Sequence, residues 1–108
     1  MYQQIDFEDF NNAFIRMDRE ENFSFQGRLL IYDYITDYED STGESVELDV
    51  ICICCDFNEL SLDDVIKEYD IPYNEGEDDI YEAIETYLKD KTIFLGFTKD
   101  DTVVFGVF

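Results

Sequence analysis

Apolar residues recur at spacings of three and four positions in four separate segments of the chain, and such spacing is typical of helices with one buried face. The first segment covers residues 6–18, and the second begins after Ser24, whose hydroxyl is suited to cap a helix. A third begins at Ser61 and ends before Pro72, and a fourth covers residues 80–88. The sequence therefore predicts four helices.

Three other segments have the patterns of strands. Residues 46–54 alternate in polarity at first and then become continuously apolar, which predicts a strand covered on both sides at its far end. Residues 92–97 and 102–108 flank a short polar turn and predict a hairpin. The order helix, helix, strand, helix, helix, strand, strand predicts an α+β fold with about three strands in an at least partly antiparallel sheet. Residues 1–108 are expected to form a single small domain, because one core suits this length.

The charge of the chain bears on its function more than on its fold. Twenty-eight Asp and Glu residues stand against seven Lys and Arg, with no His, which gives a formal net charge of −21. Repulsion among these charges opposes the compact state. However, 45% of the residues are apolar and 17% are aromatic, so the chain can fold, whereas disordered acidic tails lack such residues. We therefore expect the acidic residues to bind a partner that is a basic, nucleic-acid-binding protein. The same charge excludes direct binding of nucleic acid.

Acidic residues gather in two stripes on the predicted helices. The first stripe consists of Asp33, Asp37 and Asp40, and the second of Asp78, Glu82 and Glu85. Positions i, i+4 and i+7 share one helix face, where like charges are unfavourable, so these stripes indicate a role other than stability. Two stripes side by side, or one stripe with an acidic loop, would approach the phosphate density of a DNA strand. A merely solvated face would usually mix in Lys and Arg.

The residues predicted to bind the partner are taken from the two stripes and from the acidic segments beside them, without Glu85. In the first segment they are Asp33, Asp37, Glu39, Asp40, Glu44 and Glu47, and in the second they are Glu75, Glu77, Asp78, Asp79 and Glu82. Tyr34 and Tyr38, on the apolar side of the second helix, are expected to pack in the core or, if exposed, to anchor a partner.

The sequence offers little to catalysis, so we predict no enzyme activity, no cofactor, no metal site and no small-molecule substrate. The usual general base, His, is absent, and the five glycines are too scattered to form a phosphate loop. Cys52, Cys54 and Cys55 are not accompanied by the second pair of ligands that a zinc site needs. We expect the three thiols to be reduced and to pack in the core as part of the predicted strand. The acidic loops do not match the ligand spacing of an EF-hand, although incidental divalent binding stays open.

The chain is also predicted to stay clear of membranes. No apolar run approaches the roughly 20 residues of a bilayer-spanning helix. The first four residues have neither the basic region nor the apolar stretch of a secretory signal. These features predict a cytoplasmic protein, in a cell or an infected host cell.

The middle third of the chain carries a recognisable pattern. The stretch Asp40-Ser41-Thr42-Gly43-Glu44 leads into Val46-Glu47-Leu48-Asp49-Val50-Ile51 and then Cys54-Cys55. It resembles a group of small acidic proteins encoded by bacteriophages and prophages, in which a D-T-G-E-x-[IV]-E-L-D-V-I stretch and a following Cys-Cys recur. In size and charge the chain is also similar to the anti-CRISPR and antirestriction DNA mimics of phages. The resemblance implies an inhibitor of a bacterial defence nuclease, with a CRISPR effector as first target and a restriction enzyme as second.

Other functions fit the same residues. A regulator would bind a host basic protein, such as RNA polymerase or a histone-like protein, through the same charge. A non-catalytic structural or interaction protein would need an exposed apolar patch, and a divalent-dependent enzyme would need a clustered carboxylate site. Adaptation to high salt would explain acid without a partner, but here the acid is arranged in stripes.

Overall fold

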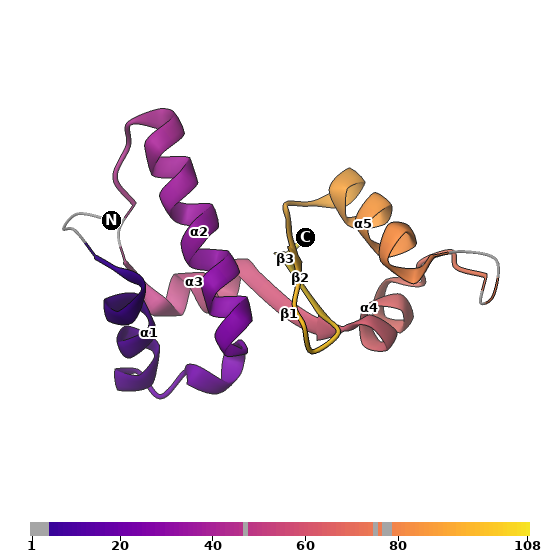
Figure 1. Cartoon of the computed structure of the whole chain (residues 1–108), viewed down its shortest axis with the longest axis horizontal. Helices are drawn as coiled ribbons and strands as arrows, with labels where there is room; N and C mark the ends of the chain where they lie inside the picture. The colour runs from indigo at the N-terminus through magenta and orange to yellow at the C-terminus, as the bar shows by residue number, and fades with distance from the viewer. Residues whose placement is uncertain (1–4, 47, 75, 77–78) are drawn as a thin grey trace.

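The computed structural model describes residues 5–46, 48–74, 76 and 79–108 and has an α+β architecture (Figure 1). Its elements are α1 (Phe7–Arg16), a 3₁₀ turn η1 (Glu20–Asn22), α2 (Phe25–Thr42), α3 (Val50–Asp56), β1 (Phe57–Ser61), α4 (Leu62–Tyr69), α5 (Ile80–Lys91), β2 (Phe94–Phe97) and β3 (Thr102–Gly106). The predicted fold class is confirmed, with five α-helices among the described residues where about four were expected.

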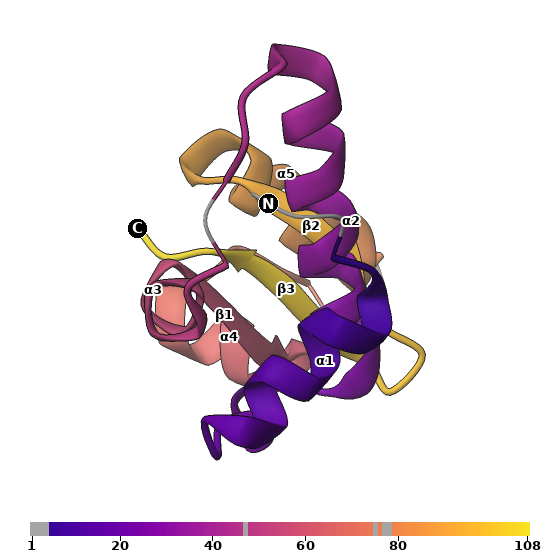
Figure 2. The ribbon, with the colours of Figure 1, turned by 90° about the vertical axis from the view of Figure 1, so that its left-hand side faces the viewer.

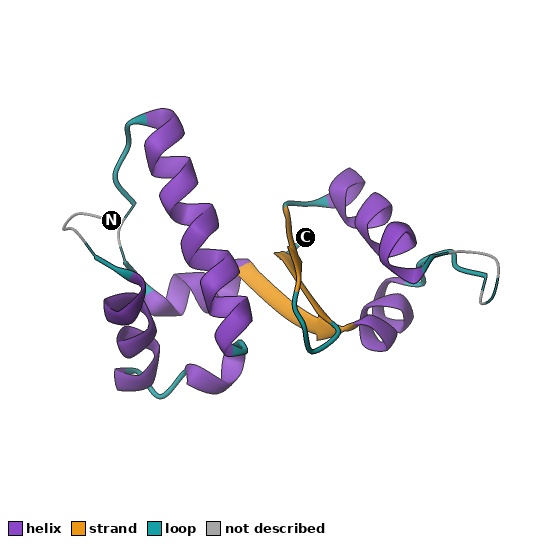
Figure 3. Ribbon diagram, in the orientation of Figure 1, coloured by secondary structure: helices purple, strands orange, loops and turns teal. Residues whose placement is uncertain are grey.

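The three strands form one antiparallel sheet in the order β1-β3-β2, so that β3 lies between the other two (Figure 2; the strands are orange in Figure 3). β1 pairs with β3 from Phe57 opposite Gly106 to Ser61 opposite Thr102. β2 and β3 form the predicted hairpin, with a register irregularity near the start of β2.

Helices cover both faces of this sheet (Figures 1 and 2). Successive side chains of a strand point to opposite faces, and β3 shows the consequence. Val104 packs in one apolar cluster with residues of α1, α2 and α3, whereas Val103 and Phe105 pack in another with residues of α4 and α5. The sheet therefore separates α2 from α5 in a molecule that measures 47 × 30 × 22 Å.

The caps of the predicted helices lie at the expected residues. The Ser24 hydroxyl accepts a hydrogen bond from the Gly27 amide (3.0 Å) at the start of α2, and the Ser61 hydroxyl accepts one from the Asp64 amide (3.2 Å) at the start of α4. Gly43 ends α2 with φ of 73°, a left-handed conformation that glycine adopts without strain. Local sequence thus determines where these helices begin and end.

The predicted strand over residues 46–54 is wrong, because most of this segment forms α3. The Asp49 carboxylate accepts a hydrogen bond from the Cys52 amide (3.1 Å) and caps the helix. Val50 and Ile53, nearly one turn apart, are its buried side chains. A short apolar run does not distinguish a helix from a buried strand by periodicity. The third strand is β1 instead, whose sequence Phe-Asn-Glu-Leu-Ser has only two apolar residues.

This correction changes the surroundings of the cysteines, all three of which are free. Cys54 is half-buried and packs against the core, but Cys52 and Cys55 are exposed on α3, so the expectation of three buried thiols in a strand is wrong. A hydrogen bond to the Asp49 carboxylate, and then the charge of that group, raise the pKa of the Cys52 thiol. The thiol is therefore protonated and weakly reactive at neutral pH.

Candidate functional site

The first acidic stripe, Asp33, Asp37 and Asp40, faces solvent on α2. All three residues are exposed, whereas Ile31 and Ile35 on the opposite side of the helix are buried. No Lys or Arg in the described part of the chain lies within 4.0 Å of these three carboxylates. We call these residues the α2 stripe, and it presents negative charge without a Lys or Arg beside it in the described part of the chain.

Packing orients the part of α2 that carries Asp33, because the buried residues of this helix lie between Gly27 and Ile35. The buried side of α2 contacts β2 and β3, and caps define both helix ends. A helix rises 1.5 Å per residue, so the first and last stripe residues are roughly 10 Å apart along the axis. Three carboxylates over that length lie about 5 Å apart, which is about two-thirds of the charge density of one DNA strand, with its phosphate every ~3.4 Å.

The acidic surface continues from α2 onto the start of α1, which sequence reasoning missed. The Tyr32 hydroxyl donates a hydrogen bond to the Ile5 carbonyl (2.8 Å) where the two helices meet. Burial, and then the negative charges of Asp6, Asp33 and Asp9, raise the pKa of Tyr32. Carboxylates of both helices therefore act on the same hydroxyl. The helix predicted over residues 6–18 gave no indication of which helix lies beside its start.

The other predicted residues of the first segment differ in their availability. Glu39 is half-buried, and its carboxylate accepts a hydrogen bond from the Val46 amide (2.8 Å), which ties the segment after α2 back to the helix. Glu44 is exposed, and the Tyr38 hydroxyl donates to its carboxylate (3.4 Å). Glu47 lies outside the described residues. Glu39 thus has a structural role, whereas Glu44 remains a candidate for partner contact.

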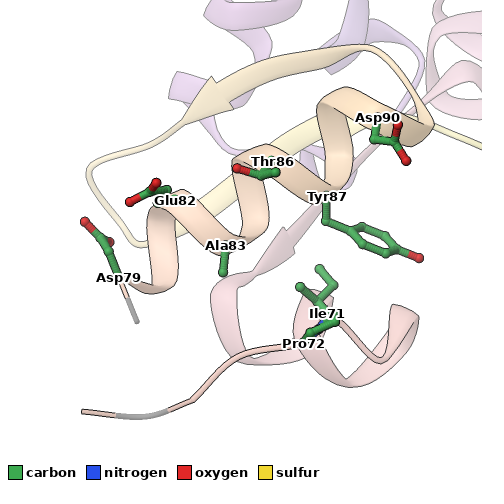
Figure 4. A pocket seen from close by; sticks show the side chains of 8 residues that line it. All are labelled: Ile71, Pro72, Asp79, Glu82, Ala83, Thr86, Tyr87 and Asp90. Atoms are coloured by element: carbon green, nitrogen blue, oxygen red, sulfur yellow. The ribbon is translucent and has the colours of Figure 1, made fainter. Parts of the chain in front are cut away.

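The second predicted segment borders an open groove of about 660 Å³ between α5 and the chain that follows α4 (Figure 4). Asp79 caps α5 by accepting a hydrogen bond from the Tyr81 amide (2.9 Å), and Glu82 is exposed one turn later. Both line one end of the groove, and Asp90 lines the other. Glu75, Glu77 and Asp78 lie outside the described residues.

The described parts of the two acidic segments do not lie side by side. α2 and α5 pack on opposite faces of the sheet (Figure 1). The charge on α5 is also partly compensated, because Lys89 pairs with Glu85 (3.1 Å) and Lys91 with Asp90 (3.5 Å). The α2 stripe with the start of α1 is therefore the stronger of the two candidate surfaces.

These acidic surfaces are suited to recognise a partner through its charge. In the part of the chain that the structure describes, no cluster of three or more His, Cys, Asp or Glu side chains is arranged to hold a metal ion. None of the helices there combines the length and apolarity needed to cross a membrane. Fixed carboxylates repel anions and accept charge-assisted hydrogen bonds from Arg and Lys.

Comparisons with models of protein families, with curated proteins and with solved structures each found no match. Function is therefore inferred from the surface of this chain.

Proposed function

We propose that the chain is a phage-encoded inhibitor of a bacterial defence nuclease, a CRISPR effector first and a restriction enzyme second. It acts in the host cytoplasm by occupying a basic DNA-binding channel as an acidic mimic of DNA. The observation that supports this most is the α2 stripe, whose three exposed carboxylates have no Lys or Arg beside them among the described residues.

The physical basis is competition for the same cations. Channels that hold DNA are lined with Lys and Arg side chains that neutralise phosphates. The guanidinium group of Arg binds a carboxylate and a phosphate with the same two-pronged geometry, so a fixed row of Asp residues can replace a row of phosphates. The net charge of −21 adds long-range attraction, which speeds the encounter with a basic channel.

The α2 side of the molecule makes the primary contact in this proposal. One channel wall meets one face of the inhibitor, and the sheet separates α2 from α5. Asp6 and Asp9 are exposed at the start of α1, which contacts α2 through Tyr32, and they add negative charge on this side. The carboxylates at the α5 groove belong to a second, weaker contact.

The test uses a guide-loaded CRISPR effector and, separately, a restriction enzyme, each with its DNA substrate. We expect the protein to block cleavage by at least one of them and to be displaced by excess substrate DNA. Its affinity for that nuclease should fall steeply as salt rises, because inhibitor and DNA use the same screened charges. Undiminished cleavage by every nuclease tested, at a large excess of the protein, would contradict the proposal. Binding to RNA polymerase or a histone-like protein without nuclease inhibition would favour the regulator instead.

A further inference from the structure

A second groove, of about 440 Å³, lies on the α2 side of the molecule and is lined mainly by apolar side chains. It runs between α2, α3 and the end of the sheet where β2 begins and β3 ends. Ile35 and Ile53 form its buried floor, and the apolar side chains around them are those of Tyr38, Val46, Ile93 and Val107. None of the acidic residues of the α2 stripe lines it.

The apolar rim of this groove is open to water. Tyr38 is 43% exposed, Ile93 is 45% exposed and Val107 is 55% exposed. Apolar side chains gathered around a hollow differ from scattered exposed ones, because they offer a continuous area that a partner can bury. Tyr34 also lines the groove, but it is half-buried and packs on the Phe57 ring (5.9 Å between centroids). Of the two tyrosines considered as anchors, Tyr38 is thus the one available to a partner.

The charges around the groove decide which partner fits. Among the described residues, the charged ones that line it are Asp49 and Asp56, at the two ends of α3, and none is Lys or Arg. The Glu44 carboxylate lies at the Tyr38 hydroxyl and adds a third negative charge nearby. A second copy of the chain also has a net charge of −21 and would be repelled by this acidic rim. Charge complementarity therefore favours a basic occupant.

We propose that this groove receives an apolar side chain flanked by Lys or Arg from a basic partner protein. The apolar side chain fills the space above Ile35 and Ile53, and the flanking cations meet Asp49 and Asp56. The identity of that partner rests on the proposed function, but the chemistry of the occupant rests on the groove itself. Such a contact anchors the inhibitor at one orientation in a channel, which charge alone does not do.

The direct test is a peptide of sequence Lys-Lys-Trp-Lys-Lys, because the chain contains no Trp and the fluorescence of the peptide reports its burial. We expect the Trp emission to shift to shorter wavelength on binding. Ile93→Ser and Val107→Ser should each weaken binding at least about threefold, since each removes apolar surface from the groove. Ile15→Ser is the matched control, because Ile15 is 49% exposed on α1 and does not line the groove. Using two groove variants guards against a folding defect in either one.

Binding of the peptide without a shift of Trp emission would overturn the groove proposal, because the peptide would then be held by charge alone. Equal binding of Glu-Glu-Trp-Glu-Glu would overturn the claim of a basic occupant. Neither result bears on nuclease inhibition, which is measured separately by DNA cleavage. Loss of inhibition and loss of peptide burial are therefore distinguishable failures.

Discussion

Among single residues, Glu59 joins the sheet to the start of the helix that carries the stripe. Its half-buried carboxylate accepts hydrogen bonds from the Ser24 amide (2.8 Å), the Ser24 hydroxyl (2.8 Å) and the Thr102 hydroxyl (2.5 Å). Negative charge is favourable at a helix N-terminus. A Cβ added at Gly27 would lie 2.1 Å from Glu59 Oε1, so that carboxylate would have to move. The cap at Ser24 was predictable, but its partner 35 residues away was not.

We expect Gly27→Ala and Glu59→Ala to be strongly non-additive. In the wild-type background Gly27→Ala displaces the carboxylate and strands the Ser24 amide, a loss of roughly 1–3 kcal/mol. That loss outweighs the gain of about 1 kcal/mol from replacing glycine in a helix. In the Glu59→Ala background the same substitution should stabilise the fold. Urea unfolding of the four proteins measures the coupling free energy, and equal effects of Gly27→Ala in both backgrounds would show that the contact carries no energy.

At the scale of elements, local sequence signals predicted four helices and the hairpin. They failed for the segment of α3, where the same apolar pattern fits a helix or a strand. Residues 24–43 carry a cap, an amphipathic period and a terminal glycine, so α2 was predictable. The segment that forms α3 is too short for its period to exclude a strand. β1 was missed because Asn58 and Glu59 interrupt its apolar pattern, and its place is determined by pairing with β3.

The contact between α1 and α2 has a predicted pH dependence. The pKa of Tyr32 is raised by burial and by Asp6, Asp33 and Asp9, so folding favours the neutral phenol. Its contribution to stability is fully present below the unfolded pKa of about 10 and is lost as pH rises through the higher folded pKa. We therefore expect the stability advantage of the wild type over Tyr32→Phe to shrink as the pH rises above about 10, measured by urea unfolding. Parallel pH profiles for the two proteins would contradict this assignment.

For the whole molecule, topology rather than local sequence decides which acidic residues act together. The helical period placed Asp33, Asp37 and Asp40 on one exposed face, as the structure confirms. It gave no information on the sheet that separates α2 from α5, nor on α1 lying beside Tyr32. No described Asp or Glu belongs to either apolar cluster, although one carboxylate oxygen of Glu20 is buried. A fold with helices on both faces thus keeps its two clusters apolar and nearly all of its acidic residues at the surface.

The central claim is that the arrangement of carboxylates on α2 matters, beyond the total charge. The most direct measurement is the affinity for the inhibited nuclease of a variant with Asp33, Asp37 and Asp40 all changed to Asn. The matched control changes Asp63 and Asp64 to Asn and Glu68 to Gln, which removes the same formal charge from exposed positions on α4, across the sheet.

We predict that the α2 variant stays folded and loses affinity about a hundredfold or more, because charge-assisted bonds to Arg or Lys contribute about 1.5–3 kcal/mol each. The control should lose only a few-fold, through weaker long-range attraction. Equal losses in the two variants would show that bulk charge alone governs binding, and would contradict a DNA-like stripe on α2.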